Sequence, residues 1–328
     1  MGYSLLSQFQ GSLLGVSLGL LSKPLTDCSA TAEKLFHPGS PLTPLQGNQS
    51  SSAVIFNSNL GLMLSLLNSM IARQGIVWQE WQQIWQTHQN LMLSQSQASD
   101  SSLHPEWEAA ITTLPMMLFF HENRCRLKQH LQTAAQLWQP EAEPEPLETT
   151  VERLALAEMV AYLLRPSPDL QQLIPYILTQ ISQETQLARQ LTQSNILLQQ
   201  GASLETVLAK LTSNLAIAIY CFLSTPTAFS VSVRRAMRTH PDSSLTAGMT
   251  GALSGSYNGL PSIPISWQLK LRRLASSTAE NSIPLDQQIL NQSTQLFQVW
   301  AGLYSPTHDP NTNPLTSLIV AAPLSLPD

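Results

Sequence analysis

Apolar residues recur at helical rather than strand spacing along almost the whole chain. Segments in which one face is apolar at positions i, i+3, i+4 and i+7 are typical of amphipathic α-helices. The longest such segments are 56–73, 105–120, 124–138, 150–164 and 204–223. The pattern therefore predicts an all-α fold, a compact bundle of many helices.

Proline and glycine cluster between these segments and predict the loops that join them. The clusters lie at 37–52, 139–146, 165–168 and 260–264. Segment 139–146 carries three glutamates and three prolines, which cannot continue a helix, so we expect an acidic, proline-rich, solvated loop. It could divide the chain into two halves, but we favour one domain over residues 1–304. Residues 305–328 then form a tail rich in proline and asparagine.

The charge content excludes several classes of protein. Only 11% of the 328 residues are charged and 43% are hydrophobic, so an intrinsically disordered chain is excluded. Sixteen Lys and Arg against 21 Asp and Glu give a net charge of −5, which argues against electrostatic nucleic-acid binding.

No apolar run is long enough for a membrane span, and no basic residue precedes the apolar N-terminal stretch as in a secretory signal. We therefore expect a cytoplasmic protein without membrane contact.

Three kinds of residue are candidates for chemistry, and each has a structural alternative. Cys28, Cys125 and Cys221 are widely spaced, so we expect buried reduced thiols rather than disulfides or a zinc site. Three tryptophans at helical spacing could stack on a ligand or a partner, although core packing is favoured: Trp78, Trp81 and Trp85. Six cations form the basic concentration of the chain, either a solvated helix face or a site for a phosphate-bearing partner: Arg234, Arg235, Arg238, Lys270, Arg272 and Arg273.

The stretch 240–267 has an unusual series of small residues. Gly248, Gly251, Gly255 and Gly259 recur every three or four positions, so one face of the expected helix has almost no side-chain bulk. Each interior glycine costs a helix about 0.5 to 1 kcal/mol relative to alanine. A sequence that accepts this cost repeatedly needs a neighbouring helix at very short distance.

This stretch resembles the ADP-ribosylglycohydrolase family, enzymes that remove ADP-ribose from modified proteins or nucleotides. The resemblance rests on GALSGSYNG at 251–259, on IPISW at 263–267 and on FQGSLLGVSLG at 9–19, which is similar to the opening helix of the family. It covers about residues 3 to 270, although 100–200 match only as generic helices. It implies an all-α fold with two Mg²⁺ ions, held by aspartate and threonine oxygens, that activate water at the ribose.

The metal-binding positions that the resemblance implies are largely lost from this chain. The first acidic motif falls on Asn57, Ser58, Asn59 and Leu60, and the second on Asp242, Ser243, Ser244 and Leu245. Leu20 stands where the family places an aspartate directly after the last glycine of the opening-helix motif. Of the matched positions only Asp242 is acidic, and we expect it to be the N-cap of the helix that follows. One carboxylate cannot offset the desolvation of two divalent ions, so no metal site is expected.

The resemblance therefore indicates a catalytically degenerate family member with no assignable catalytic residue and no cofactor. Asn57, Ser58, Asn59, Asp242, Ser243 and Ser244 would line a vestigial ligand pocket that binds ADP-ribose or a nucleotide-like ligand, unless the protein serves a protein partner instead. The alternative is an active hydrolase that uses Mg²⁺ at a reduced set of acids such as Asp27, Asp242 and Asp309.

Overall fold

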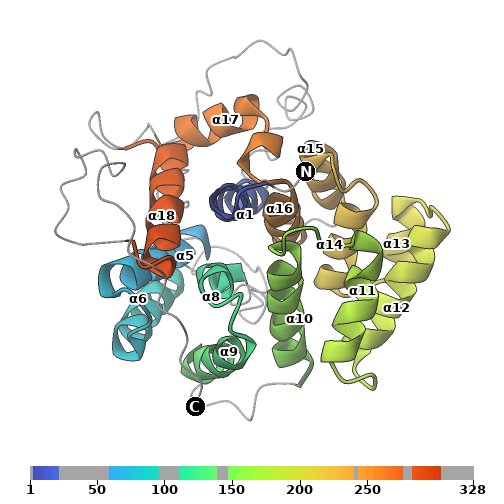
Figure 1. Cartoon of the computed structure of the whole chain (residues 1–328), viewed down its shortest axis with the longest axis horizontal. Helices are drawn as coiled ribbons and strands as arrows, with labels where there is room; N and C mark the ends of the chain where they lie inside the picture. Colours follow the sequence, from blue (N-terminus) through green and yellow to red (C-terminus); the bar gives the residue numbers. More distant parts are fainter. Residues whose placement is uncertain are drawn as a thin grey trace.

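The protein folds as a bundle of α-helices around one central helix pair (Figure 1). The computed structural model describes residues 3–21, 59–95, 111–138, 147–239, 243–275 and 283–303, without the side chains of 91–95, 138, 147–150 and 273–275. Its elements are α1 (Leu5–Leu20), α5 (Asn59–Arg73), α6 (Trp78–Gln95), α8 (Leu114–Phe119), α9 (Arg124–Trp138), α10 (Leu147–Leu163), α11 (Leu170–Gln180), α12 (Gln186–Gln199), α13 (Leu204–Lys210), α14 (Asn214–Leu223), α15 (Phe229–Ala236), α16 (Ser244–Asn258), the short 3₁₀ turn η2 (Leu260–Ser262), α17 (Ile265–Ala275) and α18 (Leu285–Trp300). These residues include no strand, which confirms the all-α prediction.

The first helix, α1, and the glycine-rich α16 lie side by side at the centre of the molecule (Figure 1). They run antiparallel, because Gly11 meets Gly255, Gly15 meets Gly251 and Gly19 meets Ala247. A Cβ atom added to Gly15 would lie 2.3 Å from the carbonyl oxygen of Gly251, and one on Gly251 would lie 2.2 Å from that of Gly15. The two backbones are thus in direct contact, as the series of small residues predicts.

Small hydroxyls and one amide bridge these two helices where glycine leaves room. Ser256 Oγ donates to Ser12 Oγ at 3.0 Å, and Ser12 Oγ donates to the carbonyl of Ala252 at 3.3 Å. Gln8 Nε2 donates to the carbonyls of Ser256 and Leu163, at 2.7 and 3.2 Å, and so joins α10 to the pair. These buried polar groups are therefore satisfied inside the central contact.

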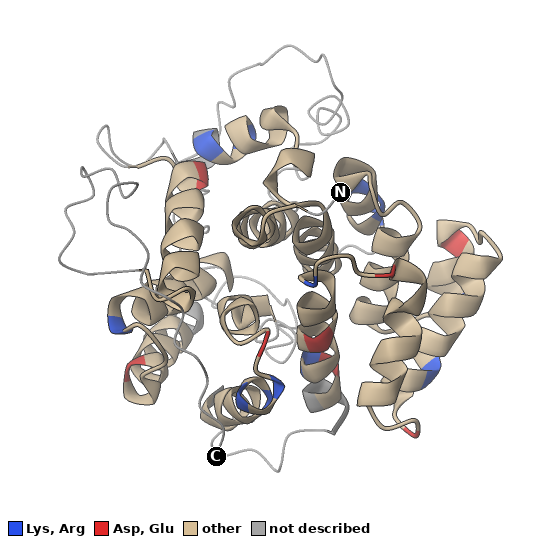
Figure 2. Ribbon diagram, in the orientation of Figure 1, with Lys and Arg blue, Asp and Glu red and all other residues tan. Residues whose placement is uncertain are grey.

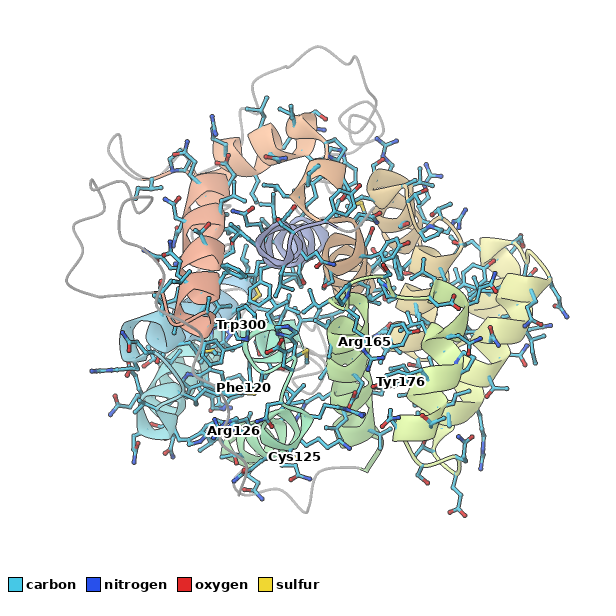
Figure 3. All side chains as sticks on the ribbon, viewed as in Figure 1. Phe120, Cys125, Arg126, Arg165, Tyr176 and Trp300 are labelled. Carbon is cyan, nitrogen blue, oxygen red and sulfur yellow. The ribbon has the colours of Figure 1, made fainter. Side chains whose placement is uncertain are left out.

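The remaining helices surround this pair and carry the charge of the described residues. Figure 2 shows α1 and α16 without coloured residues, while Lys, Arg, Asp and Glu lie on helices around them. At the corner between α10 and α11, Arg165 Nη2 donates to Tyr176 Oη at 2.9 Å, and the two labelled side chains point toward one another in Figure 3. The charged residues lie on the surrounding helices because the backbone contact between α1 and α16 leaves little space for side chains.

The tryptophan series belongs to the packed interior. Trp81 is 1% exposed and Trp85 is 8% exposed, while Trp78 makes an edge contact with Trp81 and packs beside His130. This confirms the core interpretation, and the two buried rings are not available to stack on a partner.

One expected helix is divided in two. Segment 204–223 forms α13 and α14, separated by Leu211, Thr212 and Ser213. The break has a local cause, since the extended Ser213 caps α14 by accepting from the Ala216 amide at 3.3 Å. The amide of Thr212 donates instead to Gln190 Oε1 at 2.9 Å. The prediction of one continuous helix was therefore wrong.

The other boundaries follow the pattern more closely. Segment 124–138 is helical as predicted, 150–164 extends back to Leu147 and ends at Leu163, and 56–73 is helical from Asn59, the first described residue there. Within 105–120 only residues from 111 onward are described, and α8 occupies Leu114–Phe119. The turns at 165–168 and 260–264 are present. The loops at 37–52 and 139–146 and the tail lie outside the described residues.

The two described cysteines differ in exposure. Cys221 is buried on α14, and its burial raises the pKa of the thiol to about 12, so it stays protonated and inert. Cys125 is exposed on α9, so the expectation of a buried thiol was wrong there (Figure 3). Cys28 lies outside the described residues. No helix in the described part of the chain combines the length and hydropathy of a membrane span.

Candidate functional site

The end of α1 meets the first half of α16, and apolar side chains fill the contact. A Cβ atom added to Gly248 would lie 3.3 Å from Leu20 Cδ2 and 3.1 Å from Ile111 Cδ1. The side chains of Leu20 and Ile111 therefore pack against the bare face of Gly248. Ser244 lies one turn before Gly248 on α16, so this face continues toward the start of the helix.

The start of α16 differs by one residue from the expected cap. The helix begins at Ser244, and its N-cap position falls on Ser243 rather than on Asp242. The Ser243 side chain accepts no backbone amide; its Oγ donates to the carbonyl of Met237 at 2.8 Å, which fixes the turn after α15. The expectation that Asp242 caps this helix was therefore wrong in position, and Asp242 itself lies outside the described residues.

A buried polar network lies beside this start and joins three helices. Thr246 Oγ1 donates to Asn214 Oδ1 at 3.2 Å, linking α16 to α14. Ser213, the cap of α14, donates through Oγ to Glu152 Oε1 on α10 at 2.8 Å. Glu152 is 7% exposed, so a carboxylate is buried beside the start of α14, whose first residue contacts α16. Sequence reasoning missed it because α10 is buried nearly all round, which removes the contrast between an apolar and a polar face.

The expected residues of the first motif are only partly described. Asn59 is the first residue of α5 and is partly buried, on a helix that packs against α6, α8, α18 and α1. Asn57 and Ser58 lie outside the described residues, as do the acids Asp27 and Asp309. The structure thus brings Leu20 and Ile111 together with Gly248 in the first half of α16. Their relation to Asn57, Ser58 and Asp242 stays a prediction.

Comparison with known proteins agrees with this architecture. The family model described as ADP-ribosylglycohydrolase matches residues 4–302. The chain belongs to the ADP-ribosylglycohydrolase family. A search of curated proteins finds no match to the chain.

The described residues at the family's metal-ligand positions do not fit a Mg²⁺ centre. Mg²⁺ is bound through carboxylates and other hard oxygen ligands in near-octahedral geometry. Leu20 presents a hydrocarbon side chain at its position, and the hydroxyl of Ser243 is engaged by Met237. Within the described ranges, no three His, Cys, Asp or Glu side chains are grouped closely enough to hold a metal.

The basic residues do not form one shared patch. Arg272 makes a bidentate ion pair with the buried Asp286 of α18, with Nη2 2.9 Å from Oδ2. Arg234 lies over the Trp267 ring at 5.7 Å. Burial, with a smaller contribution from Arg234, lowers the pKa of Lys270 to about 8. Arg235 instead points to the end of α14, where it donates to Ser224 Oγ. At least Arg272 is therefore structural, while Arg235 faces a separate region of the surface.

Proposed function

We propose that this member of the ADP-ribosylglycohydrolase family has lost the two-Mg²⁺ hydrolysis of ADP-ribose linkages and acts as a binding or interaction protein. The observation that supports this most directly is the packing of Leu20 and Ile111 against Gly248. Hydrocarbon fills the place where the family motif calls for a carboxylate. A charged group could enter there only with a large desolvation cost.

The retained scaffold supports a role in binding rather than a decayed protein. Direct backbone contact between α1 and α16 requires a very small residue at each crossing point, and this chain has glycine or alanine there: Gly11, Gly15, Gly19, Ala247, Gly251 and Gly255. The fold is therefore intact where the ligand positions have changed. We propose ADP-ribose or a nucleotide-like molecule as ligand, with a protein partner as the other outcome of a binding test.

A hydrolysis assay tests the loss of activity. Purified protein with ADP-ribosylated arginine and Mg²⁺ is expected to release no ADP-ribose above the rate without protein, measured by chromatography. The alternative hydrolase, using Asp27, Asp242 and Asp309, predicts turnover that Asp242→Ala abolishes and that Glu184→Ala, at an exposed acid, leaves intact. That pair of results would overturn the proposal.

Calorimetric titration with ADP-ribose tests the ligand. Heat that saturates without release of products supports a binding protein for ADP-ribose. Absence of both heat and thermal shift removes ADP-ribose as ligand and favours the protein partner.

A further inference from the structure

A large cleft opens between α11, α12 and α13, beside the last turn of α14. Its volume is about 1040 Å³, and its walls come from the first turns of α11, the last turn of α12, the turn at 201–204 and the last turn of α14. A cavity of this size accommodates a ligand as large as a nucleotide. These helices group on one side of the molecule (Figure 1).

The cleft is separate from the start of α16, where the second family motif lies. Asn214, which contacts Thr246 of α16, is the first residue of α14, whereas Tyr220 and Leu223 of the last turn line the cleft. Ten helical residues span about 15 Å. Whatever the motif region does, the cleft lies at the opposite end of α14.

One cation reaches the cleft wall without a carboxylate partner there. Arg235 is the only charged residue among the described lining residues, and its guanidinium donates to the hydroxyl of Ser224. Two acids, Asp169 and Glu205, are sequence neighbours of lining residues but are not themselves part of the lining. Asp169 caps α11 by accepting from the Gln171 amide at 2.9 Å, and Glu205 is exposed in the first turn of α13. A neutral hydroxyl does not neutralise Arg235, and a guanidinium has five N–H donors, so it can also bind an anion.

The rest of the lining suits a polar organic body. Four amide side chains, each both donor and acceptor, line the cleft: Gln171, Gln172, Asn195 and Gln199. Apolar contact comes from Ile174, Leu198 and Leu223. Tyr220 donates to the carbonyl of Ala202, and burial raises the pKa of its hydroxyl, so it remains a neutral donor. Amides can recognise sugar hydroxyls and base edges, while the guanidinium matches a phosphate.

We infer that this cleft is a binding site for an organic phosphate of nucleotide size, with Arg235 binding the phosphate and the amides contacting the sugar and base. The site does not depend on whether the family motif region has lost hydrolysis.

Calorimetric titration with AMP tests the inference, with adenosine and inorganic phosphate as the two halves of the probe. AMP is expected to bind with a Kd below 1 mM and adenosine at least tenfold more weakly. Arg235→Gln should weaken AMP binding at least tenfold. The control, Arg126→Gln, removes an equal charge from the exposed face of α9 (Figure 3) and should leave the Kd unchanged.

A second variant protects the test against misfolding of Arg235→Gln. Gln171 is exposed in the first turn of α11, so Gln171→Trp narrows the cleft without changing its charge or the core. It should abolish AMP binding while the thermal melt stays that of the wild type. The inference fails if AMP does not bind, if Gln171→Trp leaves the Kd unchanged, or if both arginine variants weaken binding equally.

Discussion

At the scale of single residues, the clearest electrostatic contact is the ion pair between α9 and α10. Arg124 Nη2 lies 2.7 Å from Glu158 Oε1, and the Glu158 side chain is 3% exposed. The Tyr176 hydroxyl also lies 3.4 Å from Glu158 Oε2. The pKa of Arg124 is raised, chiefly by its hydrogen bond to Glu158. A buried carboxylate that loses its cation remains desolvated, so the pair matters more than surface ion pairs do.

Arg124→Met should therefore destabilise the protein. We expect a loss of roughly 2 to 3 kcal/mol in the free energy of unfolding, because Arg124 is itself partly exposed and water can reach the pair from one side. Urea denaturation followed by circular dichroism measures it. Arg126→Met, two residues along α9 and exposed, is the control and should change stability by less than about 0.5 kcal/mol. Equal effects of the two variants would show that the ion pair contributes little.

The sequence shows which metal-ligand side chains are missing, but it does not show which side chains pack in their place. The positions of Leu20 and Ser243 follow from the motif alone, yet the packing of Ile111 against Gly248 depends on a chain segment about 90 residues after Leu20. Arg235 looked like one member of a basic group. Only the fold shows that it faces a cleft while Arg272 is used in an ion pair.

At the scale of elements, the close approach of α16 to a neighbouring helix was the most predictable feature. Glycines at three- and four-residue spacing in α16 indicated close packing, since only backbone contact repays their cost. The structure shows that the neighbour is α1, whose own glycines meet those of α16. The break between α13 and α14 was less predictable. The apolar pattern continues through Leu211 and does not show the hydrogen bonds that divide the helix. These are the cap of Ser213 on the Ala216 amide and the bonds from the Thr212 and Ser213 amides to Gln190.

Glycine substitutions in α16 should have graded effects. Gly251→Ala places a methyl group 2.2 Å from a backbone oxygen that cannot move alone, so we expect a loss of at least about 3 kcal/mol or failure to fold. Gly248→Ala meets only the ends of Leu20 and Ile111 side chains, which can shift, and should stay within about 1 kcal/mol of wild type. Thermal melts measure both. Gly75→Ala, where a Cβ meets nothing within 4 Å, is the control; a Gly251→Ala protein as stable as this one would contradict the packing.

At the scale of the whole molecule, the beginning of the described chain packs against its end. The first helix packs between α16 and α18, two of the last elements of the chain (Figure 1). A division into two halves at 139–146 would separate these partners, which favours the single domain over residues 1–304 that the sequence predicts.

Two fragments divided at residue 147 test this. Residues 147–328 expressed alone should lack a cooperative thermal transition, because α16 loses the backbone contact with α1. Mixing or co-expression with residues 1–146 should restore it. A cooperative melt of 147–328 by itself would show that the halves are independent domains.

The contact between α1 and α16 can form only late in synthesis, because the two helices lie at opposite ends of the chain. Ser12 and Ser256, which are hydrogen-bonded in the native state, are 244 residues apart in the chain. At about 5 to 20 residues per second a ribosome needs roughly 12 to 50 s to make the second after the first. During that interval α1, uncharged and apolar, has left the exit tunnel without its permanent neighbour. Until α16 has been made, the small-residue face of α1 therefore stays without the backbone that covers it in the native fold.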